Sequence, residues 1–263
     1  MKHVPIAVAV CSLLAPGAMV GASVGLAGPA GATGTCTTIS TSHGMLTAAI
    51  VDPSSPVTGT VMPTGCDIGV YFAPGQSGTV DNATISGFAE YGVYNEGGTV
   101  NVTDSKISDI GDTPFDGAQY GIGVYFLNPN LVSSASLSSP ATGTISGNTI
   151  SRYQKGGITV NGAGSTASVT GNTVTGLGPV SFIAQNGIQF GFGASSTPLL
   201  SGNDVSGNIY TQNGSCAPGG VGSCVGVVST GILFYDASPS PTQGTVVKAN
   251  HVYDNQANIT IVS

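Results

Sequence analysis

Three stretches of the chain share one pattern: ISGNTI (145–150), VTGNTV (169–174) and LSGNDV (200–205). Each has an apolar residue at both ends and Asn at its centre. Looser copies begin at Val80, Val102 and Val247. A second phrase, in which Gly precedes Ile or Val and an alternating run, lies between the copies, as in GIQF (187–190). The repeat unit therefore contains two short strands separated by turns.

The spacing of these copies predicts a solenoid. Ile85 and Ile107 end successive copies 22 residues apart, and Ile150 and Val174 end copies 24 residues apart, with longer intervals elsewhere. Such short strands cannot bury a face alone and must stack on their neighbours. Leucine-rich repeats need a Leu signature that is missing, and propeller blades need four strands per unit. The sequence thus predicts stacked coils of short strands.

The central Asn has a physical role in such a stack. Asn tolerates the left-handed backbone of a tight turn, and stacked Asn side chains can hydrogen-bond up a column. We therefore predict a structural ladder made by four residues, Asn148, Asn172, Asn203 and Asn250.

The composition excludes several classes of protein. Only 6% of the 263 residues are charged, 40% are hydrophobic and 41 are Gly. Apolar, charge-poor chains do not belong to the disordered class, and the shortage of Glu, Lys and Arg disfavours helices. With five Lys plus Arg and a net charge of −7, no basic stripe can neutralise a run of phosphates, so nucleic acid is not expected as a partner.

The N-terminal residues 1–32 have the features of a signal peptide. A short charged start precedes an apolar stretch, and Ala30-Gly31-Ala32 has the form of a cleavage site. The apolar run is too short to span a bilayer, which needs about 20 residues. We therefore expect a secreted or cell-surface protein with no transmembrane span. Residues 33–65 would form an N-terminal cap, with a short helix at 44–50, and residues 66–263 the repeat domain.

Four cysteines remain after the leader, and an even number in an exported chain favours disulfides. They permit three connectivities. The short loop between Cys216 and Cys224 favours their pairing, which leaves Cys36 with Cys66. Zinc is disfavoured because no C-x-x-C occurs.

The GNTIS, GNTVTG and GNDVSG phrases and the Gly-Ile strand openings over residues 66–263 resemble right-handed parallel β-helix proteins of the pectate-lyase-like superfamily. Within it, they are most similar to secreted bacterial β-helix repeat proteins. The resemblance implies an all-β, single-domain right-handed parallel β-helix of about six or seven coils. It also makes polysaccharide lyases and glycoside hydrolases the first enzyme candidates.

The residues give this enzymatic function little support. The Asn-Thr-Asp, Gly-His-Asp and Arg-Ile-Lys strings of polygalacturonase-like members are missing, and few titratable groups can converge. Lys155, directly before a strand, is the best single candidate for catalysis. We assign no catalytic residue and expect no cofactor, with one exception. The oxygen ligands of an acidic segment could hold Ca²⁺, namely Asp104, Asp109, Asp112 and Asp116.

A carbohydrate-binding face is the leading functional hypothesis. In each Gly-Ile strand alternate residues should point inward, as Val70 with Phe72, and Ile122 with Val124. Aromatic and polar residues then form an outward row, as a sugar-binding groove requires: Tyr71, Tyr94, Tyr125, Thr159, Gln189 and Tyr235. Polar residues stand just before these strands: Glu90, Gln119, Lys155 and Gln185.

The expected function is thus a non-catalytic exported protein that binds polysaccharide or cell-envelope glycans. A lyase or hydrolase with an atypical site, and a structural or adhesin-like surface module, are the alternatives. The strand-like end ITIVS (259–263) also suggests end-to-end self-association, because an uncovered strand invites pairing.

Overall fold

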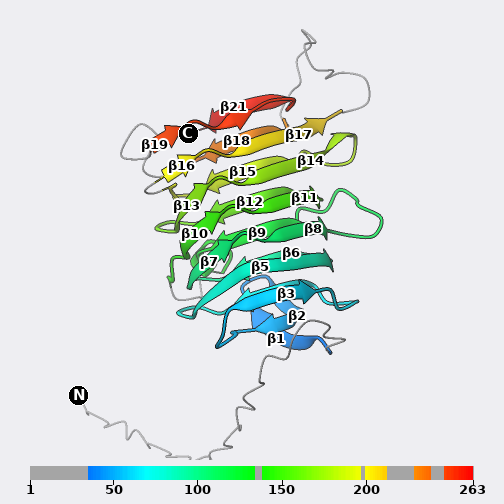
Figure 1. Ribbon diagram of the computed structural model, residues 1–263, viewed down its shortest axis with the longest axis vertical. Coiled ribbons are helices and arrows are strands. Elements are labelled where there is room, and N and C mark those ends of the chain that lie inside the picture. The colour runs from blue at the N-terminus through cyan, green and yellow to red at the C-terminus, as the bar shows by residue number, and fades with distance from the viewer. Residues whose placement is uncertain (1–34, 134–137, 197–198, 212–227, 238–245, 263) are drawn as a thin grey trace, which may run out of the picture.

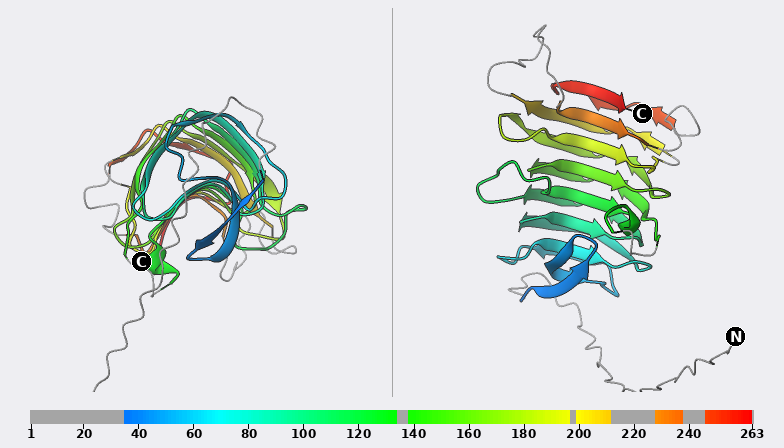
Figure 2. Two further views of the ribbon diagram at one scale, coloured as in Figure 1. Left: turned by 90° about the horizontal axis from the view of Figure 1, so that it is seen from below. Right: turned by 180° about the vertical axis from the view of Figure 1, so that it is seen from behind.

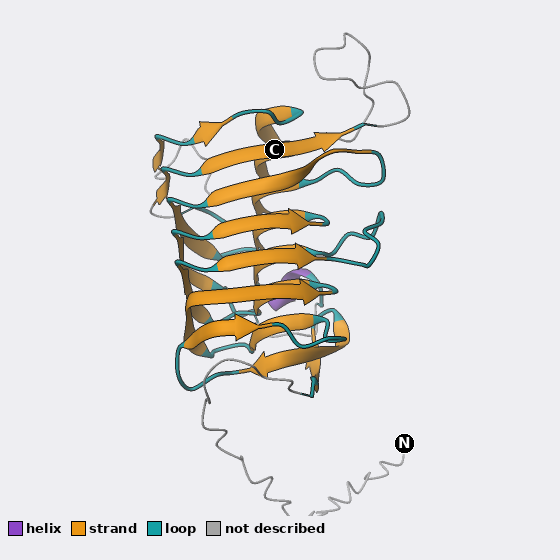
Figure 3. Cartoon of the chain, turned by 45° about the vertical axis from the view of Figure 1, so that its right-hand side comes forward, coloured by secondary structure: helices purple, strands orange, loops and turns teal. Residues whose placement is uncertain are grey.

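The computed structural model describes residues 35–133, 138–196, 199–211, 228–237 and 246–262. Most of this part of the chain consists of strands, which are stacked in successive coils (Figures 1 and 3). Its one helix is a 3-10 turn, η1 (Pro129–Leu131). No described helix has the length and apolar character needed to cross a membrane. The predicted signal peptide lies outside the described residues.

The first sheet has nine strands, and each coil adds one of them to its neighbour. All neighbours are parallel except β1, which folds back antiparallel on β2. The left view of Figure 2 shows the coils in register along the axis. The strands are β1 (Thr37–Thr41), β2 (Gly44–Val51), β4 (Ile68–Phe72), β6 (Tyr91–Asn95), β9 (Ile122–Leu127), β12 (Gly156–Asn161), β15 (Asn186–Gly191), β18 (Thr230–Tyr235) and β21 (Ala257–Val262).

The second sheet has two parallel halves that meet in the long strand β5 (Ser77–Phe88), which pairs with β7 along its first half and β8 along its second. β3 (Val57–Val61) also pairs with β5. One half contains β7 (Thr99–Thr103), β10 (Thr142–Ser146), β13 (Thr166–Thr170), β16 (Leu199–Ser201) and β19 (Val246–Lys248). The other contains β8 (Lys106–Ile110), β11 (Thr149–Tyr153), β14 (Thr173–Val180), β17 (Asp204–Tyr210) and β20 (His251–Val252).

A full coil therefore has three strands, and the prediction of two per unit was wrong. The motif ISGNTI (145–150) runs from the end of β10 into the start of β11, so the Gly-Asn pair marks a corner between two strands. Gly147 has a φ of 68° there, which a side chain would strain. The period alone does not show this corner, because both flanking apolar residues point into the same core.

The four asparagines of the motif lie at this corner and form a hydrogen-bonded column. The amides of Asn148, Asn172 and Asn203 each donate to the Oδ1 of the next Asn at 2.9 Å, and Asn250 ends the series. Each of these amides also donates to a backbone carbonyl. Ser105 extends the column by one coil, since its N–H donates to Asn148 at 3.0 Å. The ladder thereby satisfies buried polar groups at the corner between two strands, where the backbone ladder of the sheet is interrupted.

The core fills the coils with columns of apolar side chains. One column runs Val70, Val93, Val124, Ile158, Ile188 and Ile232, all 0% exposed. Ile122 was predicted to join this core, but it packs in a second apolar cluster with Tyr91 and Tyr125. Between these positions lies Gly123, where an added Cβ would lie 2.7 Å from the Gly157 carbonyl oxygen.

The predicted helix at 44–50 was wrong, because these residues form β2. Leu46 and Ala48 are buried at alternate positions of the strand, and Ala48 and Ile50 pair in register with Ile68 and Val70. A short helix was expected because one usually covers the first coil of a solenoid, whereas the alternation of buried residues is that of a strand. Because β2 and β3 pair in parallel with β4 and β5, the coils begin before residue 66.

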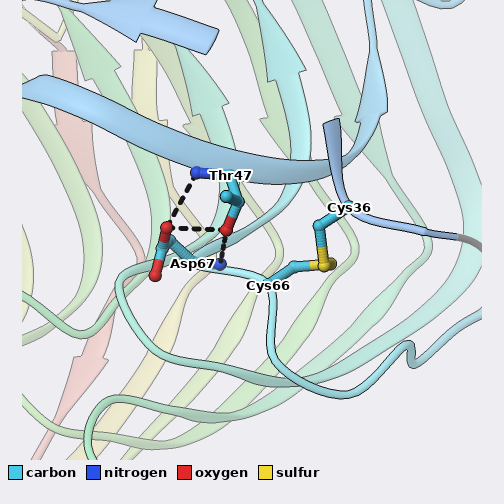
Figure 4. The surroundings of a disulfide bond; sticks show 4 residues. All are labelled: Cys36, Thr47, Cys66 and Asp67. Carbon is cyan, nitrogen blue, oxygen red and sulfur yellow. Dashed lines mark hydrogen bonds between the residues drawn. A yellow bond between two sulfur atoms is a disulfide. The ribbon is translucent and has the colours of Figure 1, made fainter. Parts of the chain in front are cut away.

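A disulfide ties this N-terminal hairpin to the coils. Cys36 and Cys66 are bonded, with their Cα atoms 5.5 Å apart. This is the pairing expected for these two cysteines. Beside it, Asp67 accepts hydrogen bonds from both the backbone N–H and the hydroxyl of Thr47, each at 2.7 Å (Figure 4). Cys216 and Cys224 lie outside the described residues.

Candidate binding cleft

The outward positions of the first sheet form one register-matched row. It runs Tyr71, Tyr94, Tyr125, Thr159, Gln189 and Leu233. Leu233 therefore occupies the position predicted for Tyr235, which lies two residues further along β18 in register with Gly191. The two halves of this row have different surroundings.

The N-terminal half of the row is covered, and the prediction that its tyrosines face solvent was wrong. Tyr71, Tyr94 and Tyr125 are 3%, 0% and 5% exposed. The tip of the β1–β2 hairpin lies over them, and the His43 ring centroid is 6.1 Å from that of Tyr94 and 6.0 Å from that of Tyr125. Tyr94 and Tyr125 stack at 5.4 Å with 12° between their planes. The hairpin buries the aromatic surface that the sequence suggested for sugar binding.

A buried carboxylate holds this covered half together. Glu96 is 2% exposed and accepts hydrogen bonds from the hydroxyls of Tyr71 at 2.5 Å and Tyr94 at 3.0 Å. The backbone N–H of Ser42, at the hairpin tip, donates to the same carboxylate at 2.5 Å. Burial and the nearby carboxylate raise the pKa of Tyr71, so its hydroxyl stays a donor. Glu96 could not be predicted as part of this face, because only the fold brings Ser42 to it.

The C-terminal half of the row opens into a cleft of about 360 Å³. Six residues predicted for the sugar-binding face line it: Gln119, Tyr125, Lys155, Thr159, Gln189 and Tyr235. Five further residues complete the lining: Ile122, Gly156, Asn161, Phe192 and Leu233. The cleft thus lies over β9, β12, β15 and β18, and it ends at Tyr125, where the covered half begins.

Two aromatic rings stand exposed at one side of the cleft. Phe192 is 39% exposed and Tyr235 is 42% exposed. Their ring centroids are 5.2 Å apart, with 55° between the planes. Phe192 follows β15 directly and has a φ of 55°, a left-handed conformation that is uncommon for a bulky residue. The pair offers apolar faces that are not used in the core.

A chain of side-chain amides forms the polar part of the site. Asn186 donates to Gln189 Oε1 at 2.9 Å, and Gln189 donates to Asn161 Oδ1 at 3.1 Å. Asn186 is 7% exposed, and its Oδ1 is one of two buried side-chain polar atoms without a partner among the described residues. It lies in register with Gly156 and Ile122, which both line the cleft. Buried acceptors in proteins are usually hydrogen-bonded, either to protein groups or to ordered water.

Of the described residues that line the cleft, Lys155 alone is charged. Its Nζ donates to the carbonyl of Ala184 at 2.9 Å, and burial lowers its pKa. The chain as a whole carries a net charge of −7, whereas the lining of the cleft contains one cation and no carboxylate.

A comparison with protein families agrees with this architecture: the model of a right-handed beta helix region matches residues 69–263. The chain belongs to the right-handed β-helix family. The predicted fold class is therefore confirmed. No curated protein and no solved structure gives a significant match. The family description names a fold and no activity.

Besides Tyr71 and Tyr94, two further predicted contact residues of the β-helix lie away from the cleft lining. Gln185 is fully buried; its amide donates to the Tyr153 carbonyl at 2.5 Å and its Oε1 accepts from Leu177 N–H at 3.0 Å. It braces a corner, so its prediction as a ligand contact was wrong. Glu90 is half-buried near Asp67 and Asp112, and burial together with these two charges raises its pKa to about 7.

The structure also separates the four aspartates predicted to bind calcium. Asp109 pairs with Arg152, whereas Asp112 and Asp116 both accept from the Gln154 amide, at 3.4 and 3.3 Å. Asp104 lies at another corner of the β-helix, beside Gly147. Within the described ranges, no group of three or more His, Cys, Asp or Glu side chains is placed to hold a metal ion.

Proposed function

We propose that this right-handed β-helix protein binds a polysaccharide or cell-envelope glycan in the cleft over β9, β12, β15 and β18. The observation that carries the proposal is that one cleft combines an exposed aromatic pair, a chain of amides and a single cation. Sugar sites need apolar faces for stacking and a few convergent polar groups for hydroxyls.

The aromatic pair supplies the stacking surface. A pyranose ring has one face lined by C–H groups, and Tyr235 and Phe192 can cover such a face with exposed carbon surface. Exposed aromatic surface of this kind favours a ligand because its burial removes apolar area from water. Leu233, the last position of the row, also lines the cleft and adds to its apolar surface.

The polar groups define the preferred sugar. Gln189 and Asn161 both line the cleft and present amide groups to ligand hydroxyls. Lys155 donates to a neutral carbonyl and has no carboxylate beside it in the cleft. A charge-assisted hydrogen bond to a ligand carboxylate would satisfy it. We therefore propose an acidic glycan, one that carries uronic acid units.

The proposal also includes export of the protein from the cell. The leader at 1–32 has the features of a signal peptide, and the Cys36–Cys66 disulfide is typical of oxidising compartments. An extracellular or cell-surface location would place the cleft beside envelope and environmental polysaccharides.

Calorimetric titration with uronic-acid oligosaccharides and with neutral ones of equal length tests the proposal. Lys155→Met should weaken binding of the acidic ligand about tenfold or more, because a hydrogen bond to a charged group contributes about 1.5–3 kcal/mol. Lys106→Met removes an exposed lysine of β8, outside the cleft, and should leave the affinity unchanged. Absence of binding by any glycan, or equal effects of the two variants, would contradict the proposal.

One observation favours a lyase as the second candidate. The lowered pKa of Lys155 suits a general base, and a base in this cleft could remove the proton next to a uronate carboxylate. Incubation with polyuronates, followed by ultraviolet absorbance of unsaturated products, separates the two functions. A binding protein gives no product, whereas a lyase gives product that disappears in Lys155→Met.

A further inference from the structure

We infer that the cleft takes the end of a glycan chain rather than its interior, because the β1–β2 hairpin occupies the continuation of the cleft. The inference rests on the proposed function and adds to it the part of the polymer that is recognised. It follows from the geometry of the single row that runs along the first sheet.

The row would be a through-groove without the hairpin. Its six positions are in register on adjacent parallel strands, about 4.8 Å apart. The aromatic residues continue beyond the cleft, since Tyr94 on β6 and Tyr71 on β4 follow Tyr125 in register toward the N-terminal end of the stack. A chain lying along the axis over Thr159 would next meet Tyr125 and then the space above Tyr94. The hairpin tip fills that space.

The hairpin is fixed at both ends, so it forms a wall rather than a loose flap. At its base, the Cys36–Cys66 disulfide and the Thr47–Asp67 hydrogen bonds tie it to the coils (Figure 4). At its tip, the Ser42 N–H donates to the buried Glu96 carboxylate, and the Ser42 hydroxyl lies 3.3 Å from the Tyr94 hydroxyl. Opening it would leave the Glu96 carboxylate short of a donor in a buried site, which is costly.

The open length of the row fixes how much ligand fits. Four strands, β9, β12, β15 and β18, contribute to the cleft, and three spacings of about 4.8 Å span roughly 14 Å. One strand spacing is roughly 4.8 Å, and a pyranose unit in a polysaccharide has a similar length, so about three sugar units fill the cleft. Further units at the covered end would clash with the hairpin, whereas units at the other end would extend past β18.

The experiment uses the wild-type protein and uronic-acid trisaccharides and hexasaccharides capped at one end, at the other end or at both with a bulky group. Capping the end that meets the hairpin should weaken binding at least about tenfold, and capping the opposite end should change it little. The hexasaccharide should bind about as tightly as the trisaccharide, because only the terminal units enter the cleft.

Equal binding of doubly capped and uncapped hexasaccharide would overturn the inference while leaving the proposed function intact. Failure of every uncapped oligosaccharide to bind would overturn the proposed function, and the inference with it. A variant that opens the wall gives a second test: Ser42→Pro with His43→Gly removes the N–H donor and the covering ring. The doubly capped hexasaccharide should bind this variant more tightly than it binds the wild-type protein. If capping weakens binding to the variant as much as it weakens binding to the wild type, the inference is also contradicted.

Discussion

The two halves of one strand face share a register but differ in what covers them. In the N-terminal half, Tyr71 and Tyr94 lie under the β1–β2 hairpin and donate to a buried carboxylate. In the C-terminal half, Gln189 and Tyr235 line an open cleft. The repeat places the same kind of outward position on every coil, so a segment from outside the repeat decides which positions become core and which become surface.

This difference separates packing from binding on a face that looks uniform in sequence. A tyrosine in the covered half stabilises the protein, because its ring and its hydroxyl are both used internally. A tyrosine in the open half contributes little to folding, because its ring remains partly in water. Substitutions in the two halves should therefore affect different properties.

The largest expected effect comes from truncating the most buried ring of the row. Tyr94→Ala should lower the free energy of unfolding by about 3–5 kcal/mol, because it leaves a cavity and removes a donor from Glu96. Tyr235→Ala is the matched control and should change stability by only about 0.5 kcal/mol while weakening glycan binding. Urea denaturation of both variants measures the contrast. Equal stability losses would mean that the two halves do not differ in packing.

The next largest effect concerns the anchor of the cover. Replacing both Cys36 and Cys66 by Ser should destabilise the protein by about 2–4 kcal/mol, because the disulfide restricts the unfolded chain. The loss should appear in thermal unfolding. The cleft itself lies on β9 to β18, so the variant should still bind a short oligosaccharide below its melting temperature. Full loss of binding would show that the cleft depends on the cover.

The smallest expected effect is a pH dependence at the edge of the covered half. The pKa of Glu90 is raised to about 7 in the folded state from its ordinary value of 4.5. The folded state then holds a proton that the unfolded state has lost between these values, so this group's contribution to stability falls as pH rises through that window.

Glu90→Gln isolates this contribution, because both proteins keep every other group. Desolvation lowers the pKa of His43, which acts in the opposite sense, since stability is lost as pH falls through its folded value. Measured as a difference between variant and wild type, the His43 effect cancels. The variant should gain stability relative to wild type from about pH 5 to about pH 8, and a constant difference would contradict the raised pKa.

Much of the fold could be predicted from the sequence, because the same pattern of apolar and turn residues recurs in successive coils. The asparagine column and the inward residues follow from spacing alone, since Asn148 and Val124 recur in equivalent places on other coils. The helix expected at 44–50 was wrong because that segment occurs once and has no repeat to constrain it. The same segment supplies the hairpin, so its misassignment also hid the burial of Tyr71 and Tyr94.

The site was predicted only in its open half for the same reason. Lys155, Gln189 and Tyr235 were chosen from their place relative to the strands, which the repeat fixes. Phe192 and Asn161 were missed because they stand at strand ends, where the alternation gives no direction. Glu96 was missed because its partners lie up to 54 residues away in sequence.

The difference between the covered half and the open half of the row is tested most directly by tyrosine nitration followed by mass spectrometry, with and without a bound uronic-acid trisaccharide. Tyr235 should be nitrated in the free protein and protected by the ligand, whereas Tyr71 and Tyr94 should be protected in both states. Rapid nitration of Tyr71 and Tyr94 in the folded, ligand-free protein, or their protection only by ligand, would show that the row is one open face and contradict the account.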